Sequence, residues 1–172
     1  AGMAIQGMKP FTAIYSSFLQ RGYDNIIHDV ALQKLPVTFC LDRAGLVGGD
    51  GPTHHGAYDF SYMLHIPDLI ISAPKDGNEL RNLMHTAHAY DDGPFSIRYP
   101  KGSCLAWDNN LKAKKLKIGR WESLRTGEDV VVLAAGSIVY TVEEALSALE
   151  KEGFRMGLVN ARFIKPFDKK ML

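Results

Sequence analysis

The feature that most constrains the fold is a regular alternation of short apolar runs with segments of helical period. Runs rich in β-branched and aromatic residues predict strands at 9–15, 37–42, 68–74, 94–100, 129–136 and 155–162. Between them, apolar residues recur every three to four positions and predict helices at 17–33, 76–90 and 140–152. This order predicts an α/β fold, in which a mostly parallel sheet is flanked by helices and part of a second α/β unit follows.

The composition of the chain changes after the fourth predicted strand. Residues 101–117 mix glycine, asparagine and several lysines without a period, which is typical of a linker. We therefore expect a first domain at 1–100, a linker at 101–117 and the start of a second domain at 118–172. The first and last residues resemble interrupted helices, so the chain is expected to be a piece of a longer protein.

Composition excludes several classes of function. The 20 Lys and Arg residues balance 19 Asp and Glu residues, so nothing favours a nucleic-acid partner. No apolar run is long enough to span a bilayer, and no signal peptide is visible, so we expect no membrane partner and a cytoplasmic location, with the plastid stroma as an alternative. Cys40 and Cys104 lack metal-ligand spacing and are expected to be free thiols.

Two polar segments follow predicted strands and carry most of the reactive side chains. "YSSFLQR" begins at Tyr15, and the glycine-rich "DRAGLVGGDGPTHHG" begins at Asp42. Carboxyl ends of parallel strands meet at one edge of a sheet, where ligands bind in open α/β folds. We therefore expect one cleft formed by Tyr15, Phe18, Arg21, Arg43, Asp50 and His54. The alternative, a long mobile surface loop, remains open at this point.

The residue types within these segments indicate different kinds of chemistry. Asp50 can orient the imidazole of His54, whose ordinary pKa is suited to proton transfer. His54 and His55 point in opposite directions in an extended chain, so no metal site is expected. Arg98 and Lys101, after the fourth strand, can hold a phosphate, or can be basic groups at a domain junction.

One apparent motif is interpreted as coincidental. "GDG" at 49–51, followed by Asn78, is similar to a pattern that binds a magnesium–diphosphate unit. That pattern needs its Asp and Asn on successive turns around the ion, whereas a helix and a strand are expected to intervene here. Asn78, like Asp76, is instead a candidate cap for the helix that follows.

Several longer segments resemble a known family. "YSSFLQRGYDNIIHDVALQKLPV", "DRAGLVGGDGPTHHGAYDFSY", "IPDLIISAP" and "DDGPFSIRYPKG" are similar to the 1-deoxy-D-xylulose-5-phosphate synthase family, which belongs to the thiamine diphosphate-dependent transketolase superfamily. The resemblance covers nearly the whole chain. It implies a pyrimidine-binding domain followed by the beginning of the family's C-terminal domain.

The resemblance also implies an activity and a set of site residues. The family condenses pyruvate, with loss of carbon dioxide, and D-glyceraldehyde 3-phosphate, in a reaction used for isoprenoid, thiamine and pyridoxal biosynthesis, and it acts as a homodimer. By resemblance, Phe18 stacks on the aminopyrimidine of thiamine diphosphate, Arg21 lines the same site, and Arg43 and Lys101 hold the acceptor phosphate. Tyr15 and Arg43 face the substrates, while Arg21, Asp50 and His54 line the active site, where Asp50 and His54 orient the donor and handle protons.

Departures from the family pattern limit what this chain can do alone. Lys101 replaces an arginine that the family usually has, which keeps the charge but loses the two-pronged geometry. The glutamate that activates the aminopyrimidine and the domain that holds diphosphate and Mg²⁺ are expected outside the chain, so the chain alone is expected to be inactive. Alternatives are a transketolase, a 2-oxoacid dehydrogenase beta subunit, a non-catalytic binding module and, more remotely, a metal hydrolase.

Overall fold

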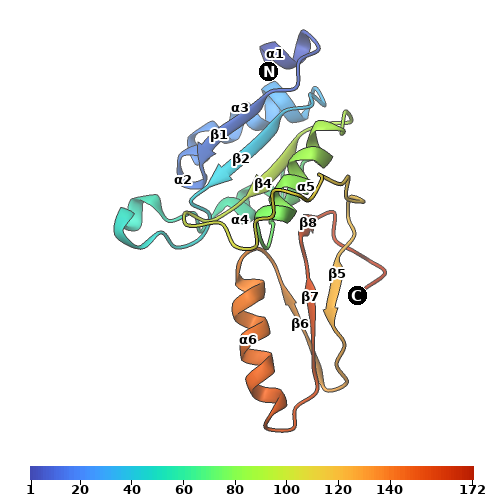
Figure 1. Ribbon diagram of the computed structural model, residues 1–172. Coiled ribbons are helices and arrows are strands. Elements are labelled where there is room, and N and C mark those ends of the chain that lie inside the picture. Colours follow the sequence, from blue (N-terminus) through green and yellow to red (C-terminus); the bar gives the residue numbers. More distant parts are fainter.

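The computed structural model describes all 172 residues as two sheets with helices packed against them (Figure 1). The first sheet has the strand order β1-β2-β4-β3-β8 and contains β1 (Phe11–Tyr15), β2 (Thr38–Asp42), β3 (Ile70–Ser72), β4 (Phe95–Arg98) and β8 (Phe163–Lys165). Its first four strands run parallel, and β8 pairs antiparallel with β3. The second sheet has the order β5-β7-β6 and contains β5 (Glu122–Arg125), β6 (Val130–Ala134) and β7 (Met156–Asn160).

The helices cover both faces of the first sheet. One face packs against the helical stretch 16–31 and α4 (Asp59–Met63) in a core that includes Leu41 and Met63. The other face packs against α5 (Gly77–His88) in a core that includes Leu83 and Phe95. The alternation of side chains along β2 to β4 places apolar groups on both faces, as a sheet covered on both sides requires.

The second sheet is covered on one face by α6 (Ile138–Glu150), seen at the lower left of Figure 1. Val139, Leu146 and Leu158 form the centre of this smaller core. The short helix α1 (Gly2–Ile5) lies at the opposite end of the molecule. No helix combines the length and the apolar character needed to cross a membrane.

The expected α/β class is confirmed, with differences in detail. The helix expected over 17–33 is a series of short pieces: α2 (Ser16–Leu19), a 3-10 turn (Gln20–Gly22), α3 (Tyr23–Asn25) and a π-helical segment (Ile26–Ala31). Asp76, rather than Asn78, caps α5, because its carboxylate accepts a hydrogen bond from the Glu79 amide at 2.7 Å. The helix expected at 140–152 begins two residues earlier.

Two strands of the structure were not expected from the sequence. β5 lies directly after the expected linker, and β8 follows β7 but joins the first sheet instead of the second. Trp121 adds to this connection, since its indole donates to the Phe163 carbonyl at 2.7 Å. Residues 163–165 therefore complete the sheet that carries the candidate site.

Candidate active site at the carboxyl edge of the first sheet

Three aromatic rings converge where β1 and β2 end. Tyr15 and Phe18 stack with their centroids 4.8 Å apart, and the His54 ring meets Phe18 edge-on at 5.3 Å. Tyr15 is the last residue of β1, whereas Phe18 lies on the first helical turn after it. The glycine-rich loop brings His54 back to this turn from across the sheet edge, as the strand topology predicted.

A chain of alternating charges lies beside these rings. The Arg43 guanidinium lies 3.7 Å over the Tyr15 ring, donates from Nε to Asp50 at 2.9 Å and donates from Nη1 to Asp42 at 3.0 Å. The other oxygen of Asp50 accepts from Lys101 Nζ at 2.5 Å. Asp50 therefore bridges the two cations that the family resemblance assigns to phosphate binding.

This arrangement determines the charge of Asp50. Hydrogen bonds from Lys101 and then from Arg43 hold the pKa of the carboxyl below its ordinary value. Asp50 therefore stays ionised to a lower pH than an unpaired aspartate, and both of its oxygens accept hydrogen bonds. Its geometry supports an orienting role.

A cavity of about 530 Å³ opens beside Phe18. Ser17, Phe18, Arg21 and Thr53 line it, and Phe18 is 48% exposed, so its ring is accessible from the cavity. Thr53 Oγ1 lies 3.0 Å from His54 Nδ1, so this wall continues into the histidine. The cavity thus offers one flat apolar surface with polar and cationic groups around it.

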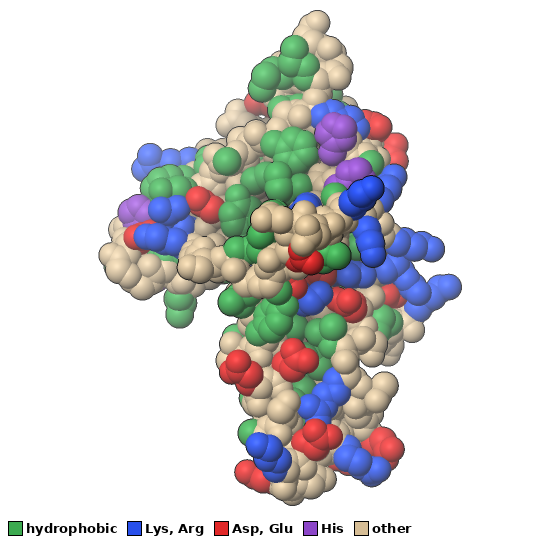
Figure 2. All heavy atoms as spheres, viewed as in Figure 1, with side chains coloured by type: hydrophobic (Ala, Val, Ile, Leu, Met, Phe, Trp, Pro, Cys, Tyr) green, Lys and Arg blue, Asp and Glu red, His purple; other side chains and the backbone are tan.

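The glycine-rich loop is closed at its base by tight backbone contacts. Gly45 and Gly56 exchange two backbone hydrogen bonds, at 2.9 and 2.8 Å. A Cβ at Gly56 would lie 2.6 Å from Ser16 Oγ and would collide with the Arg43 carbonyl, so glycine is required there. His55 accepts a hydrogen bond from the Val47 amide at 3.1 Å and belongs to the loop itself. Figure 2 shows charged and histidine side chains gathered on this projecting part of the molecule.

Arg98 lies apart from the other predicted phosphate ligands. Its Nε donates to Asp59 at 2.7 Å, its Nη2 donates to the Gly56 carbonyl at 3.3 Å, and its guanidinium covers the Phe60 ring at 4.1 Å. Asp59 is almost completely buried. These contacts anchor the end of the glycine-rich loop to β4 and give phosphate binding by Arg98 no support.

Asn78 is engaged far from the loop that contains "GDG". Its side chain bonds to Arg81, to the Asp108 amide and to the Ala106 carbonyl. No group of three or more His, Cys, Asp or Glu side chains is placed to hold a metal ion. The coincidental interpretation of "GDG" with Asn78 is consistent with these contacts.

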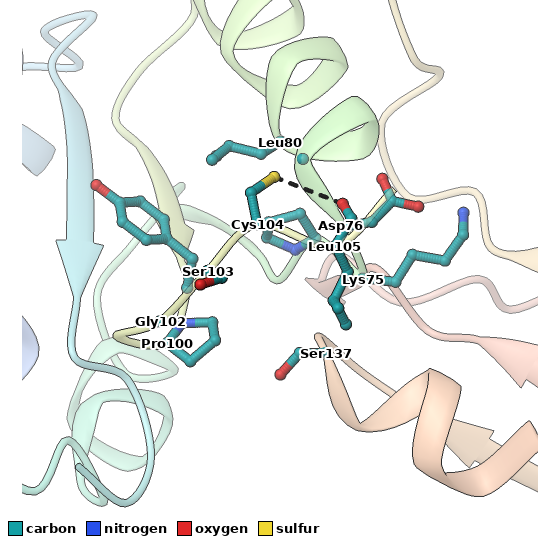
Figure 3. A pocket seen from close by; sticks show the side chains of 12 residues that line it. Lys75, Asp76, Leu80, Pro100, Gly102, Ser103, Cys104, Leu105 and Ser137 are labelled. Atoms are coloured by element: carbon teal, nitrogen blue, oxygen red, sulfur yellow. Dashed lines mark hydrogen bonds between the residues drawn. The ribbon is translucent and has the colours of Figure 1, made fainter. Parts of the chain in front are cut away.

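Two of the other cavities differ from this one in position and size. One of about 550 Å³ lies at the amino edge of the sheet, between Lys34, Asp68 and Lys165, away from the converging side chains. The second, of about 130 Å³, lies between the two sheets (Figure 3). Cys104 projects into it and its Sγ bonds to the Leu105 carbonyl. Of these cavities, only the one beside Phe18 is both large enough for a small-molecule ligand and lined by predicted site residues.

Sequence reasoning missed two residues that hold this site together. Asp42 bonds to Arg43, and Asp59 bonds to Arg98. The position of Asp42, directly before Arg43 at the end of a strand, is a signal that the sequence did contain. Asp59 and Arg98 are 39 positions apart, and no local pattern links them.

Comparisons with known proteins agree with this architecture. Residues 1–105 match the family described as "Transketolase, pyrimidine binding domain", and residues 119–172 match "Transketolase, C-terminal domain". The chain is 55% identical over 172 residues to 1-deoxy-D-xylulose-5-phosphate synthase of Aquifex aeolicus and 54% identical over 168 residues to that of Dictyoglomus turgidum. These matches include 100% and 98% of this chain, but they span only about a quarter (27%) of the length of each relative.

Solved structures show the same fold. A structure described as "Split gene transketolase, inactive beta4 tetramer" matches with a TM-score of 0.86 and 26% identity, over 99% of this chain and 55% of that chain. A transketolase from Pichia stipitis matches with a TM-score of 0.81 and 24% identity, over 94% of this chain and 24% of that one. This second likeness concerns the fold alone.

The fold and the converging side chains define the ligand-binding part of an α/β enzyme, with its site at the carboxyl edge of a mostly parallel sheet. With the matches over residues 1–105 and 119–172, the chain belongs to the transketolase family.

Proposed function

We propose that this chain is part of a 1-deoxy-D-xylulose-5-phosphate synthase, called the complete enzyme below. In the proposed reaction, pyruvate loses carbon dioxide, and its remaining two-carbon unit forms a bond to the aldehyde carbon of D-glyceraldehyde 3-phosphate, whose oxygen takes up a proton. The high identity to synthases of this name supports the proposal. The single observation that carries it is the cluster of Tyr15, Phe18, Arg43, Asp50 and Lys101 at one sheet edge.

The cavity beside Phe18 fits the aminopyrimidine of thiamine diphosphate. A half-exposed phenyl ring at the edge of a 530 Å³ space can stack on a planar heterocycle, and Arg21 and Thr53 provide polar groups around it. When bound, thiamine diphosphate supplies the electron sink that decarboxylation of a 2-oxoacid requires. Phe18 and Arg21 would hold and orient this cofactor.

Arg43 and Lys101 suit the phosphate of the acceptor. They already share one anionic partner, Asp50, which is the geometry that a second anion needs in order to contact both cations. A phosphate carries more charge and more acceptor oxygens than a carboxylate, so it can take over these hydrogen bonds. By holding the phosphate, Arg43 and Lys101 would place the aldehyde carbon at the other end of the acceptor near the three rings.

His54 and Tyr15 are the candidates for proton handling and orientation. Thr53 occupies Nδ1 of His54, and no protein group bonds to Nε2. The free nitrogen can exchange a proton with the oxygen of a substrate that lies against Phe18. Tyr15 contacts both Phe18 and Arg43 and would keep both side chains in place.

Other parts of the complete enzyme must supply what this chain lacks. We assign Mg²⁺ and the diphosphate contacts to those parts, since the carboxylates and histidines here are not placed for a metal. We also propose a homodimer in the cytoplasm. Its contact surface would include the exposed apolar side chains near α1, visible at the upper end in Figure 2, namely Met3, Ile5, Met8 and Phe11.

The test is carbon dioxide release from pyruvate by the complete enzyme with thiamine diphosphate and Mg²⁺. We expect D-glyceraldehyde 3-phosphate to stimulate release, and Arg43→Ala to raise the KM of this acceptor at least tenfold. If pyruvate is not consumed while a ketose phosphate serves as donor, the chain belongs to a transketolase instead. If pyruvate is consumed without response to the acceptor, a 2-oxoacid dehydrogenase is the better assignment.

A further inference from the structure

The two carboxylates that bond to Arg43 differ in how firmly the fold holds them. Asp42 is the last residue of β2 and pairs in register with Tyr15 across the sheet. Asp50 lies on a short 3-10 turn inside the glycine-rich loop. The sheet therefore fixes the position of Asp42, whereas the position of Asp50 depends on the loop.

The backbone of Arg43 is also unusual. Its φ angle is +54°, in the left-handed region that residues other than glycine rarely adopt. Such a conformation is strained for a residue with a side chain, so the surrounding structure must hold it in place. Here it turns the side chain back over Tyr15 and between the two carboxylates.

The two carboxylate oxygens of Asp42 differ in their partners. Oδ2 accepts from Arg43, while Oδ1 is buried and accepts no hydrogen bond. The side chain as a whole is 33% exposed. Asp42 thus has a single protein partner, Arg43, and its position serves that contact.

We propose that Asp42 is a positioning residue for Arg43. When the acceptor phosphate displaces Asp50 from Arg43, the hydrogen bond to Asp42 keeps the guanidinium directed at the phosphate. This inference rests on the proposed function. Nε is the group that an incoming phosphate takes over from Asp50, while Nη1 stays on Asp42. The guanidinium also stacks on the Tyr15 ring. Asp42 and Tyr15, at the ends of neighbouring strands, therefore hold it in a fixed position.

A purely electrostatic role and a positioning role for Asp42 predict opposite effects of its removal on phosphate binding. A second anion beside Arg43 lowers the positive potential that attracts phosphate, so its removal would tighten phosphate binding. A positioning role predicts weaker binding, because the free guanidinium must then lose conformational entropy when it binds. The sign of the change therefore distinguishes the two roles.

The experiment compares phosphorylated and unphosphorylated D-glyceraldehyde as acceptors for the complete enzyme. We expect Asp42→Ala to lower the ratio of the two kcat/KM values about tenfold, chiefly through the KM of the phosphorylated acceptor. Asp42→Asn keeps an oxygen that can accept from Nη1 and should restore part of this ratio. Asp91→Ala, which removes an exposed carboxylate paired with Lys9 at the other edge of the sheet, is the matched control.

A double-mutant cycle removes the ambiguity of a folding defect. In an Arg43→Ala background, Asp42→Ala should change the ratio less than twofold, since the residue has no target left to position. A ratio that is unchanged or rises in Asp42→Ala, or that falls equally with and without Arg43, overturns the inference. If the wild-type enzyme does not use the phosphorylated acceptor, the proposed function fails instead, and the two failures are distinguishable.

Discussion

The side chain of Arg98 and the buried carboxylate of Asp59 form an ion pair of 2.7 Å between the end of β4 and the start of α4. Asp59 is 1% exposed, and Arg98 is 15% exposed. Because Arg98 also bonds to the Gly56 carbonyl, this pair connects the base of the glycine-rich loop to the sheet. The pair therefore supports the loop that carries the candidate site.

Removal of one partner of this pair should destabilise the first sheet strongly. Arg98→Ala leaves the Asp59 carboxylate buried and unpaired, which costs about 3 kcal/mol or more. The buried thiol of Cys40, on β2, reports such opening, and burial already raises its pKa. We expect peptide-resolved thiol labelling of Cys40 in the complete enzyme to accelerate at least tenfold in Arg98→Ala.

The control for this prediction is Lys34→Ala. Lys34 and Asp68 form a largely exposed pair at 3.7 Å, which should contribute less than about 0.5 kcal/mol. Labelling of Cys40 should be nearly unchanged in this variant. An equal effect of the two substitutions on Cys40 labelling would show that burial of the Arg98–Asp59 pair adds nothing to the stability of the first sheet.

Phe18 should determine the affinity for the cofactor. Replacement by alanine removes a stacking surface worth about 0.5–1.5 kcal/mol in addition to its buried area, so we expect thiamine diphosphate to bind about tenfold more weakly. Phe18→Leu keeps apolar bulk without the flat ring and should lie between the two. The measurement is activity of the complete enzyme against cofactor concentration, and wild-type affinity in Phe18→Ala would contradict the stacking role.

Binding of the phosphorylated acceptor should become tighter when Lys101 is replaced by arginine and weaker when it is replaced by alanine. Its ammonium contacts Asp50 as a single point charge, whereas a guanidinium can bind a phosphate through two hydrogen bonds. We expect Lys101→Arg to lower the KM of the phosphorylated acceptor by up to about fivefold and Lys101→Ala to raise it about tenfold. Steady-state kinetics with D-glyceraldehyde as the unphosphorylated control measures both effects. Equal KM values in all three proteins would remove Lys101 from the phosphate site.

The contact between the two sheets should depend on pH through Glu122. Burial raises the pKa of Glu122, but hydrogen bonds from Lys75 and Asn160 lower it more, so the net pKa is below the ordinary value. A depressed folded-state pKa contributes stability above the unfolded value, near 4.3, and this contribution is lost as pH falls through the folded value. Conversely, although burial lowers the pKa of Lys75, Glu79 and Glu122 raise it, so its contribution persists below about pH 10.

The variant Glu122→Gln tests this contact. It should be less stable than the wild type at neutral pH and should show a smaller loss of melting temperature as pH falls from about 5 to 3. Thermal unfolding of the complete enzyme across this range provides the comparison. Parallel pH profiles for the two proteins would show that the cluster does not couple folding to protonation of Glu122.

Local patterns accounted for most strands and helices and for the convergence of the site. The period of apolar residues is a property of adjacent positions, and parallel strands bring their carboxyl ends together whatever their order. This is why Tyr15, Phe18, Arg43, Asp50 and His54 could be assigned to one cleft before their contacts were known. The family resemblance then supplied roles for them that spacing alone does not provide.

Tertiary structure decided the features that depend on distant partners. The short run at 163–165 becomes a strand only because β3 offers an open edge, and Arg98 becomes an anchor only because Asp59 is buried beside it. Likewise, Asp42 and Asp50 are both acidic residues near a glycine-rich segment, and only the fold shows that one is fixed by the sheet and the other by the loop. The sequence determined the set of reactive groups and the edge where they meet. Packing between distant residues determined which of them hold the others in place, because burial and hydrogen bonding are properties of the assembled chain.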